Sequence, residues 1–233
     1  MSDGRKTVAI VQSNYIPWRG YFDLMNLVDE FILFDDMQYT RRDWRNRNVI
    51  KSPAGLKWLT IPVEVKGRYL QSIKDTVISD REWSERHWKT LVHCYGKANH
   101  FEAYRERLED LYLNTTETHL SAVNHRFIKF VCDLLKIETT ITWSMDYRLS
   151  GGKTERLADL CEQAGANEYL SGPAARAYLD ETEFTRRGIK VSYMDYSGYS
   201  EYCQLYPPFA PNVSILDLIL NEGPEATRFM KSF

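Results

Sequence analysis

The chain has 233 residues and a mass of 27.4 kDa, enough for one large domain that buries about 70% of the surface its unfolded form exposes. Hydrophobic residues make up 43% of the chain and charged residues 27%, which excludes a disordered or collagen-like protein. The net charge of −2 gives no general attraction to nucleic acid or to an acidic membrane, so any polyanion must be held locally.

The spacing of the cysteines indicates whether the chain holds a metal site and whether its cellular compartment is reducing. The four cysteines, Cys94, Cys132, Cys161 and Cys203, lie far apart and form no C-x-x-C pair, so we expect no metal site and a reducing compartment. The apolar run at residues 8–11 is too short for a secretory signal. No stretch approaches the roughly 18 apolar residues of a membrane span. The prediction is a cytoplasmic protein without a membrane span.

The first 36 residues predict a strand, a loop, a helix and a second strand. Residues 7–12 are rich in β-branched side chains, residues 21–28 have helical character, and residues 30–36 are again apolar. Such a βαβ unit implies a parallel sheet with a right-handed crossover, and we expect residues 7–12 at its centre. Residues 37–48 then predict a long polar loop or hairpin. Residues 56–65 predict a strand end or sheet edge, because Pro62 interrupts them.

The middle of the chain has helical periodicity without a strand signal, from residue 80 to residue 136. Beyond it, strands are predicted at 139–143, 168–170 and 189–193, with helices at 153–164, 174–179 and 215–221. The predicted fold class is therefore α/β, a Rossmann-like and mostly parallel sheet with a helical subdomain in mid-chain. The predicted parts are an α/β half with an Arg-rich loop (1–79), the helical subdomain (80–136), and the second α/β half with the terminal helix (137–233).

Loops after the carboxyl ends of parallel strands are the usual place for ligands. The loop at residues 12–20 precedes a helix start, which suits phosphate, although no G-x-G-x-x-G is present. A merely structural turn is the alternative. The candidate binding residues of this loop are Gln12, Asn14, Tyr15, Trp18 and Gly20.

The second candidate loop, residues 40–48, interleaves four arginines with a tryptophan. Arginine binds phosphate bidentately and stacks on planar rings, so the loop is predicted to clamp a nucleotide diphosphate or an anionic substrate. A solvated charged face is the alternative. Its candidate binding residues are Arg41, Trp44, Arg45 and Asn46.

Further candidates lie at strand ends and helix starts. Asp35 and Asp36 end the second strand, where alternation sends only one of them to the crevice. Its role there is that of a base, a metal-water anchor or a ribose ligand, and a solvated strand end or cap is the alternative. Asn124 points inward from a helix with His125 at the edge of that face, and a core amide is the alternative.

The glycine-led helix start at residues 151–154 makes Lys153 and Thr154 an anion site or a plain cap, since Tyr147 rules out a P-loop. Ser171, in a turn without the G-x-S-x-G pattern, is the last binding candidate. We expect the loops at 12–20, 35–48 and 150–154 to converge on one crevice.

Several of these segments together resemble the WbqC-like family. The resemblance rests on the segments QSNYIPWRGYF (12–22), RNRN (45–48), GKT (152–154), YLSG (169–172) and PNVSILD (211–217), with Asp35 and Gln38-Tyr39 between them. Such proteins are bacterial and are encoded among genes for O-antigen and other surface polysaccharides. The resemblance therefore implies a transferase in O-antigen or lipopolysaccharide biosynthesis that places an acyl or aminoacyl group on a nucleotide-linked amino sugar. It transfers no catalytic residues.

A second, partial similarity concerns the loop at residues 14–21, which looks like a degenerate H-x-G-H loop of nucleotidylyl-transferase-like ligases. Trp18 and Tyr21 stand in place of the histidines, and Gly20 is kept. This similarity adds an ATP-using amide ligase as an alternative.

In the transferase hypothesis, Arg41, Arg45 and Lys153 hold the diphosphate of a nucleotide-linked sugar. Asp35 or His125 deprotonates the sugar amine, and the aromatic rings of both loops pack on base or hexose. No cofactor is firmly implied, and the donor is an acyl-CoA, an amino acid with ATP, or a charged tRNA. The alternative is a non-catalytic partner that presents the sugar nucleotide to a glycosyltransferase. A homodimer remains open.

Overall fold

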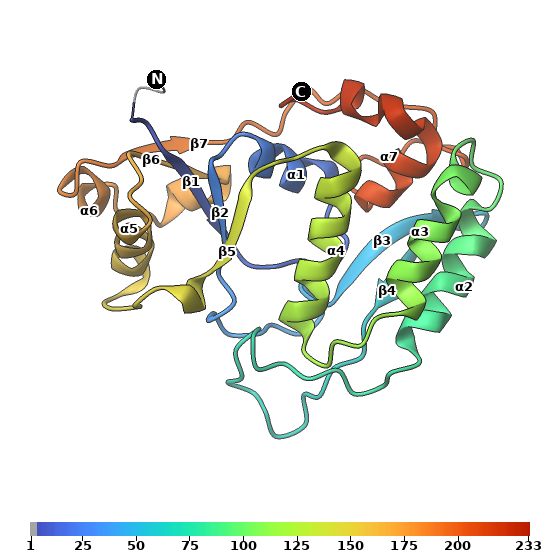
Figure 1. Cartoon of the computed structure of the whole chain (residues 1–233), viewed down its shortest axis with the longest axis horizontal. Coiled ribbons are helices and arrows are strands. Elements are labelled where there is room, and N and C mark those ends of the chain that lie inside the picture. Colours follow the sequence, from blue (N-terminus) through green and yellow to red (C-terminus); the bar gives the residue numbers. More distant parts are fainter. Residues whose placement is uncertain (1–3) are drawn as a thin grey trace.

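Five parallel strands form the central sheet in the order β5-β2-β1-β6-β7, in a computed structural model that describes residues 4–233. The predicted α/β class and the central place of the first strand are thus confirmed. Both faces of the sheet are covered, as parallel sheets require (Figure 1). The strands are β1 (Thr7–Val11), β2 (Glu30–Leu33), β5 (Thr140–Trp143), β6 (Glu168–Ser171) and β7 (Lys190–Tyr193).

Alternating side chains of the sheet build two separate hydrophobic clusters. Ala9 and Phe31 face α1 (Arg19–Asn26) and α4 (Leu120–Leu135). Val8, Ile10 and Ile32 face α5 (Lys153–Gln163) and α6 (Thr182–Thr185) on the other side. Figure 1 shows α5 and α6 to one side of the strands and α4 to the other.

The sheet has a topological switch point between β1 and β6. After β1 the chain turns to α1 on the first face, whereas after its parallel neighbour β6 it turns to α6 on the second. The loops that follow β1 and β6 therefore diverge. A crevice between diverging loops is where doubly wound sheets bind their ligands.

Helices occupy most of residues 80–136, as predicted. They pack against the face of the sheet that α1 and α4 cover. They are α2 (Trp83–Tyr95), α3 (Phe101–Leu113) and α4. The same cluster of buried side chains includes Trp83 of α2, Leu111 of α3 and Phe31 of β2. One hydrophobic core thus crosses the predicted boundary at residues 79/80.

A hairpin separate from the main sheet corrects the prediction for residues 37–65. It pairs β3 (Arg47–Ser52) with β4 (Gly55–Thr60), so a strand begins inside the predicted loop and the next ends before Pro62. The sequence gives no strand signal for β3 because its polar side chains are buried by distant partners. Asn48 Nδ2 donates to the carbonyls of Tyr15 (3.1 Å) and Ile16 (2.9 Å). Lys51 Nζ, also buried, donates to carbonyls of the segment at 206–208.

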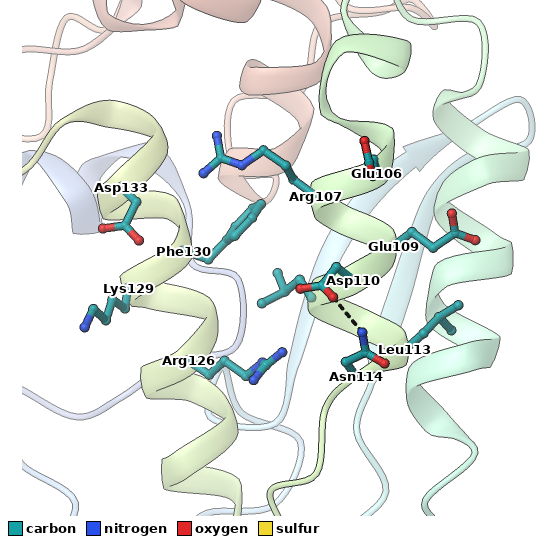
Figure 2. A pocket seen from close by; sticks show the side chains of 11 residues that line it. Glu106, Arg107, Glu109, Asp110, Leu113, Asn114, Arg126, Lys129, Phe130 and Asp133 are labelled. Atoms are coloured by element: carbon teal, nitrogen blue, oxygen red, sulfur yellow. Dashed lines mark hydrogen bonds between the residues drawn. The ribbon is translucent and has the colours of Figure 1, made fainter.

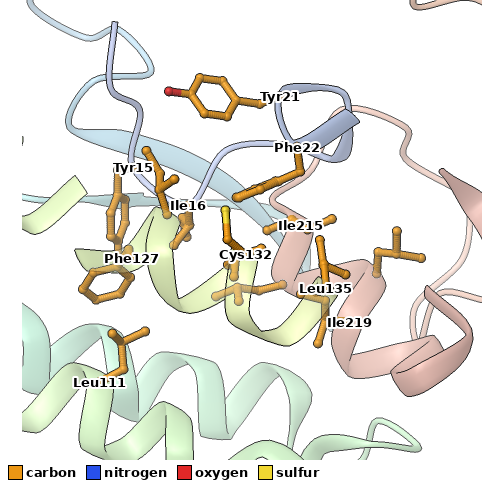
Figure 3. Packing of buried hydrophobic residues seen from close by; sticks show 14 of the residues in the cluster. Tyr15, Ile16, Tyr21, Phe22, Leu111, Phe127, Cys132, Leu135, Ile215 and Ile219 are labelled. Atoms are coloured by element: carbon orange, nitrogen blue, oxygen red, sulfur yellow. The ribbon is translucent and has the colours of Figure 1, made fainter. Parts of the chain in front are cut away.

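The C-terminal helix α7 (Ile215–Glu222) closes the first core. Figure 3 shows Ile215 and Ile219 of α7 beside Leu135 of α4, whereas Phe127 of α4 lies beside Tyr15. Short 3₁₀ helices occupy Ser144–Asp146 (η1), Pro173–Ala177 (η2) and Gly223–Phe229 (η3). The structure has η2 where an α-helix at 174–179 is predicted, and α6 and η3 are additional. Within residues 4–233, no helix is long and apolar enough to cross a membrane.

Candidate functional site

The loop after β1 is held in an unusual backbone shape beside the Arg-rich loop. Ile16 has a φ of 38°, a left-handed value that β-branched residues rarely adopt. Asn48 of β3 fixes this turn through the two carbonyl contacts described above, and the Tyr15 amide donates to the Trp44 carbonyl at 3.1 Å. Strain retained by surrounding contacts is common at functional sites.

Arg45 reaches into this loop and is held mainly by neutral oxygens. Its Nη1 donates to Asn14 Oδ1 at 3.1 Å, and its Nη2 donates to Gln12 Oε1. The nearest carboxylate oxygen in an ion pair is Asp43 Oδ1, 3.6 Å away, and the side chain is 17% exposed. Its buried Nε has no hydrogen-bond partner among the described residues. The guanidinium is therefore positioned, incompletely neutralised and partly accessible.

Asn124 of α4 links the loop at residues 12–20 to the loop at residues 40–48. Its Nδ2 donates to Ser13 Oγ (3.0 Å) and to the Arg45 carbonyl (2.9 Å), and its side chain is wholly buried. Its Oδ1 has no partner in the described part of the chain, and the same holds for buried Asn46 Oδ1. Buried polar atoms without partners are rare in folded proteins, so these two oxygens retain the capacity to accept a hydrogen bond from a further donor. We call the group formed by Gln12, Ser13, Asn14, Arg45 and Asn124 the arginine cradle.

Asp35 lies behind the cradle, fully buried. One carboxylate oxygen accepts from the Ser13 amide at 2.8 Å, and the other accepts from Ser121 Oγ of α4. Burial raises the pKa of Asp35, and the hydrogen bonds from Ser121 and Ser13 oppose that rise. Asp36 instead pairs with Lys74 and accepts from Ser144 Oγ, so only one of the two neighbouring carboxylates faces the cradle.

His125, next to Asn124 on α4, packs against Trp143 at the carboxyl end of β5, with ring centroids 4.3 Å apart and ring planes tilted by 43°. Burial, and secondarily the charge of Lys129, lowers the pKa of His125 below its ordinary 6.5. The imidazole is therefore neutral near pH 7. It lines a hollow of about 230 Å³ together with Lys129 and Asp133.

The aromatic candidates take different positions. Tyr15 is fully buried, and its hydroxyl hydrogen-bonds His87 Nδ1 and the Tyr112 hydroxyl, both at 2.9 Å. Trp18 packs on Tyr196 and Tyr199. A Cβ at Gly20 would lie 2.4 Å from the Trp18 ring, so the absence of a side chain at Gly20 leaves room for the Trp18 ring. Trp44, in contrast, is 42% exposed.

The remaining candidates lie outside the cradle. Lys153 is exposed, and Thr154 is half-buried at the start of α5 on the second face. The Glu155 carboxylate already accepts from the Gly152 amide there. Ser171 ends β6 beside β1 and donates to the Tyr169 hydroxyl at 3.2 Å. Exposed Arg41 donates to the Val65 carbonyl at 3.3 Å. No hydrogen bond or ion pair within residues 4–233 links Lys153 or Thr154 to the cradle.

Ser13 and Ser121 are the polar residues of the site that sequence reasoning missed. Ser121 lies three residues before Asn124 on the inward face of α4, so helical spacing could have pointed to it. Ser13 lies between two candidate residues, and nothing in the sequence marks it as the buried partner of Asp35.

A hollow larger than the one at His125 lies away from the cradle, in a groove of about 790 Å³ between α3 and α4. Figure 2 shows Phe130 and Arg107 facing each other across it, with Asp110 and Arg126 below. None of the candidate residues from the sequence lines this groove. Among residues 4–233, no three or more His, Cys, Asp or Glu side chains gather in a way that could hold a metal ion.

The fold and the cradle define a doubly wound α/β protein with a polar, cationic group at the carboxyl ends of its central strands. The model of the WbqC-like protein family matches residues 12–229. The chain belongs to this family, as its motifs suggested. It is 53% identical over 226 residues to a protein of Mycobacterium tuberculosis (strain ATCC 25618 / H37Rv) named "Uncharacterized protein Rv1507c", covering 97% of this chain and 98% of that protein. No solved structure matches the chain.

Proposed function

We propose that the protein is a transferase that places an acyl or aminoacyl group on the amine of a nucleotide-linked sugar, in O-antigen or other surface-polysaccharide biosynthesis. The observation that carries this proposal is the Arg45 guanidinium, held by two amide oxygens and 3.6 Å from its nearest paired carboxylate. A diphosphate would supply the missing negative charge through charge-assisted hydrogen bonds. Membership of the WbqC-like family supports the proposed place in surface-polysaccharide biosynthesis.

The position of the cradle supports a nucleotide ligand. It follows β1 directly, next to the point where the β1 and β6 loops diverge, and Ser171 closes β6 on the other side. Trp44 next to Arg45 offers an exposed ring for stacking. In this arrangement the diphosphate lies at Arg45, with Gln12 and Asn14 orienting the guanidinium.

His125 is the group that we assign as the base. Its neutral imidazole accepts a proton from the sugar amine as the nitrogen attacks the acyl carbonyl carbon and a new C–N bond forms. The bond from that carbon to the donor's sulfur or oxygen breaks, and the leaving group takes the proton. Buried Asp35 is a positioning residue, because both its oxygens hold neighbours of the cradle. The donor classes are an acyl-CoA, an amino acid activated by ATP, or a charged tRNA.

The test is mass spectrometry of products after incubating the full chain with a panel of UDP- and dTDP-linked amino sugars and the three donor classes. We expect activity to rise with pH through the lowered pKa of His125 and to level off near neutral pH. His125→Gln should lower the rate by about a hundredfold or more. The control is His93→Gln, at an exposed position on α2.

The outcomes separate the two classes of function. Sugar-nucleotide binding without any product would favour the non-catalytic partner of a glycosyltransferase. Product formation that requires ATP and a free amino acid would identify an amide ligase. Absence of sugar-nucleotide binding would contradict both forms of the proposal.

A further inference from the structure

Charge is distributed unevenly along the chain. Residues 37–72 contain eight lysines and arginines but only two acidic residues, in a protein whose net charge is −2. Both acids are engaged within the segment. Glu64 pairs with Arg68 at 2.9 Å, while Asp43 accepts from Thr40 Oγ1 at 2.7 Å and lies near Arg45. The segment therefore presents an excess of positive charge.

The same segment exposes large apolar side chains. Leu70 is 86% exposed and Tyr69 is 71% exposed, while Trp44 and Trp58 are 42% and 45% exposed. In Figure 1 the chain between β4 and α2 extends beyond the helices at the lower edge of the molecule. Exposed apolar groups collected at one place mark an interaction surface.

Contacts join these side chains into one surface. The Trp44 and Trp58 rings lie 5.4 Å apart, and the Arg47 guanidinium lies 4.1 Å over Trp58. Arg47 also donates to the Arg42 carbonyl, and the guanidinium of Arg41 lies 5.7 Å from the Tyr69 ring centre. We call this surface the basic apolar face; it comprises Arg41, Arg42, Trp44, Trp58, Tyr69 and Leu70.

The protruding tip is fixed by backbone contacts. Gln38 Nε2 donates to the Tyr69 carbonyl at 2.7 Å, and the Tyr39 amide donates to the Gln71 carbonyl at 2.9 Å. Gln71 Nε2 in turn donates to the Glu64 carbonyl at 2.7 Å. Leu70 is therefore presented outward by an ordered loop.

We propose that the basic apolar face docks the protein on an anionic lipid bilayer. Cations attract acidic headgroups, tryptophan and tyrosine rings favour the interface, and an exposed leucine enters the acyl boundary. Single-stranded nucleic acid also binds arginines and stacked rings, but stacking gives no role to Leu70, the most exposed apolar side chain here. Docking shares Trp44 with the proposed nucleotide site, but it is tested separately from the transferase proposal, since it requires neither a nucleotide nor a reaction.

The test is flotation of the full chain with vesicles of phosphatidylcholine, with and without about one third phosphatidylglycerol, at about 0.1 M salt. We expect binding only to the vesicles that contain phosphatidylglycerol, and weaker binding at high salt. Lys66 is exposed in the same segment, three residues before Tyr69. Arg42→Glu with Lys66→Glu should weaken partitioning by about tenfold or more. Leu70→Glu should also weaken it, without changing the circular dichroism spectrum.

Matched variants test whether the effect belongs to this face. Arg81→Glu with Lys97→Glu makes the same charge change at exposed positions elsewhere and should leave partitioning unchanged. Tyr69→Ser should weaken partitioning, whereas its control, Tyr178→Ser at a position that is 68% exposed, should leave it unchanged. The proposal is overturned by equal binding to neutral vesicles, by no binding to either kind, or by controls that weaken binding as much. Binding of poly(A) without binding of vesicles also overturns it, in favour of nucleic acid.

Discussion

Two of the buried polar clusters in this protein differ in how completely their groups are paired. Around Asp217 of α7, the hydroxyls of Tyr95 and Tyr202 each donate to one carboxylate oxygen at 2.7 Å. The Lys51 amide donates to the Tyr95 hydroxyl at 3.0 Å. The arginine cradle, in contrast, leaves Arg45 Nε and Asn124 Oδ1 without partners among the described residues. A completed network stabilises the fold, whereas an incomplete one leaves polar capacity for a ligand.

The largest expected effect is on stability, at the complete cluster. Asp217→Ala leaves two buried tyrosine hydroxyls without their acceptor and removes the negative charge near Lys51. We therefore expect the free energy of unfolding to fall by about 3–5 kcal/mol. Urea denaturation measures this change. Tyr202→Phe, which removes one hydrogen bond, should cost about 1 kcal/mol. A loss below that of Tyr202→Phe would show that the Asp217 cluster does not hold α7 in place.

The second effect is on binding, at the incomplete cluster. Arg45→Ala should weaken affinity for a UDP- or dTDP-linked amino sugar by about 1.5–3 kcal/mol, since a charge-assisted hydrogen bond is lost. Arg45→Lys should restore only part of the affinity, because an ammonium cannot reproduce the planar fork. Titration calorimetry gives both values, with Arg156→Ala, at an exposed position of α5, as the control. Unchanged affinity in Arg45→Ala would remove the distinction between the two clusters.

A third effect concerns pH. Burial raises the folded-state pKa of Asp35 above its ordinary 3.8, so the folded protein binds this proton more tightly than the unfolded chain does. The stability gained in this way is complete below the unfolded pKa and is lost as pH rises through the folded pKa, by about 1.4 kcal/mol per unit of pKa difference. Asp35→Asn should therefore lose less stability than the wild type over that window.

Urea denaturation at a series of pH values from about 3.5 upward compares the two proteins. The exposed carboxylate Asp75 supplies the control variant, Asp75→Asn. Parallel pH profiles for wild type and Asp35→Asn would mean that the hydrogen bonds from Ser13 and Ser121 offset burial completely.

The smallest effect is expected for Lys153→Ala. The side chain is exposed on α5, and no hydrogen bond or ion pair within residues 4–233 joins it to the cradle. We expect stability to change by less than about 0.5 kcal/mol and the affinity for the sugar nucleotide to stay near that of wild type. A loss comparable to that of Arg45→Ala would place the start of α5 in the same site as the cradle.

Local patterns in the sequence are sufficient for the strands of the main sheet, the long helices and the family. Apolar periodicity marks β1, β2 and α4 because these elements bury one face or both, and their buried positions carry apolar residues at regular spacing. The inward orientation of Asn124 and the division of roles between Asp35 and Asp36 also follow from periodicity alone.

Only tertiary structure decides which polar residues meet. The sequence does not reveal β3, because Asn48 and Lys51 are paired with carbonyls about 30 and 155 residues away. It favours Tyr15 and Trp18 as ligand platforms, yet they pack against side chains of other elements. It also groups Lys153 with Arg45, since both lie near strand ends, but the crossover after β5 sends α5 to the opposite face of the sheet from α1 and α4. Spacing along a chain records local periodicity, whereas contacts between distant polar groups depend on how the layers pack.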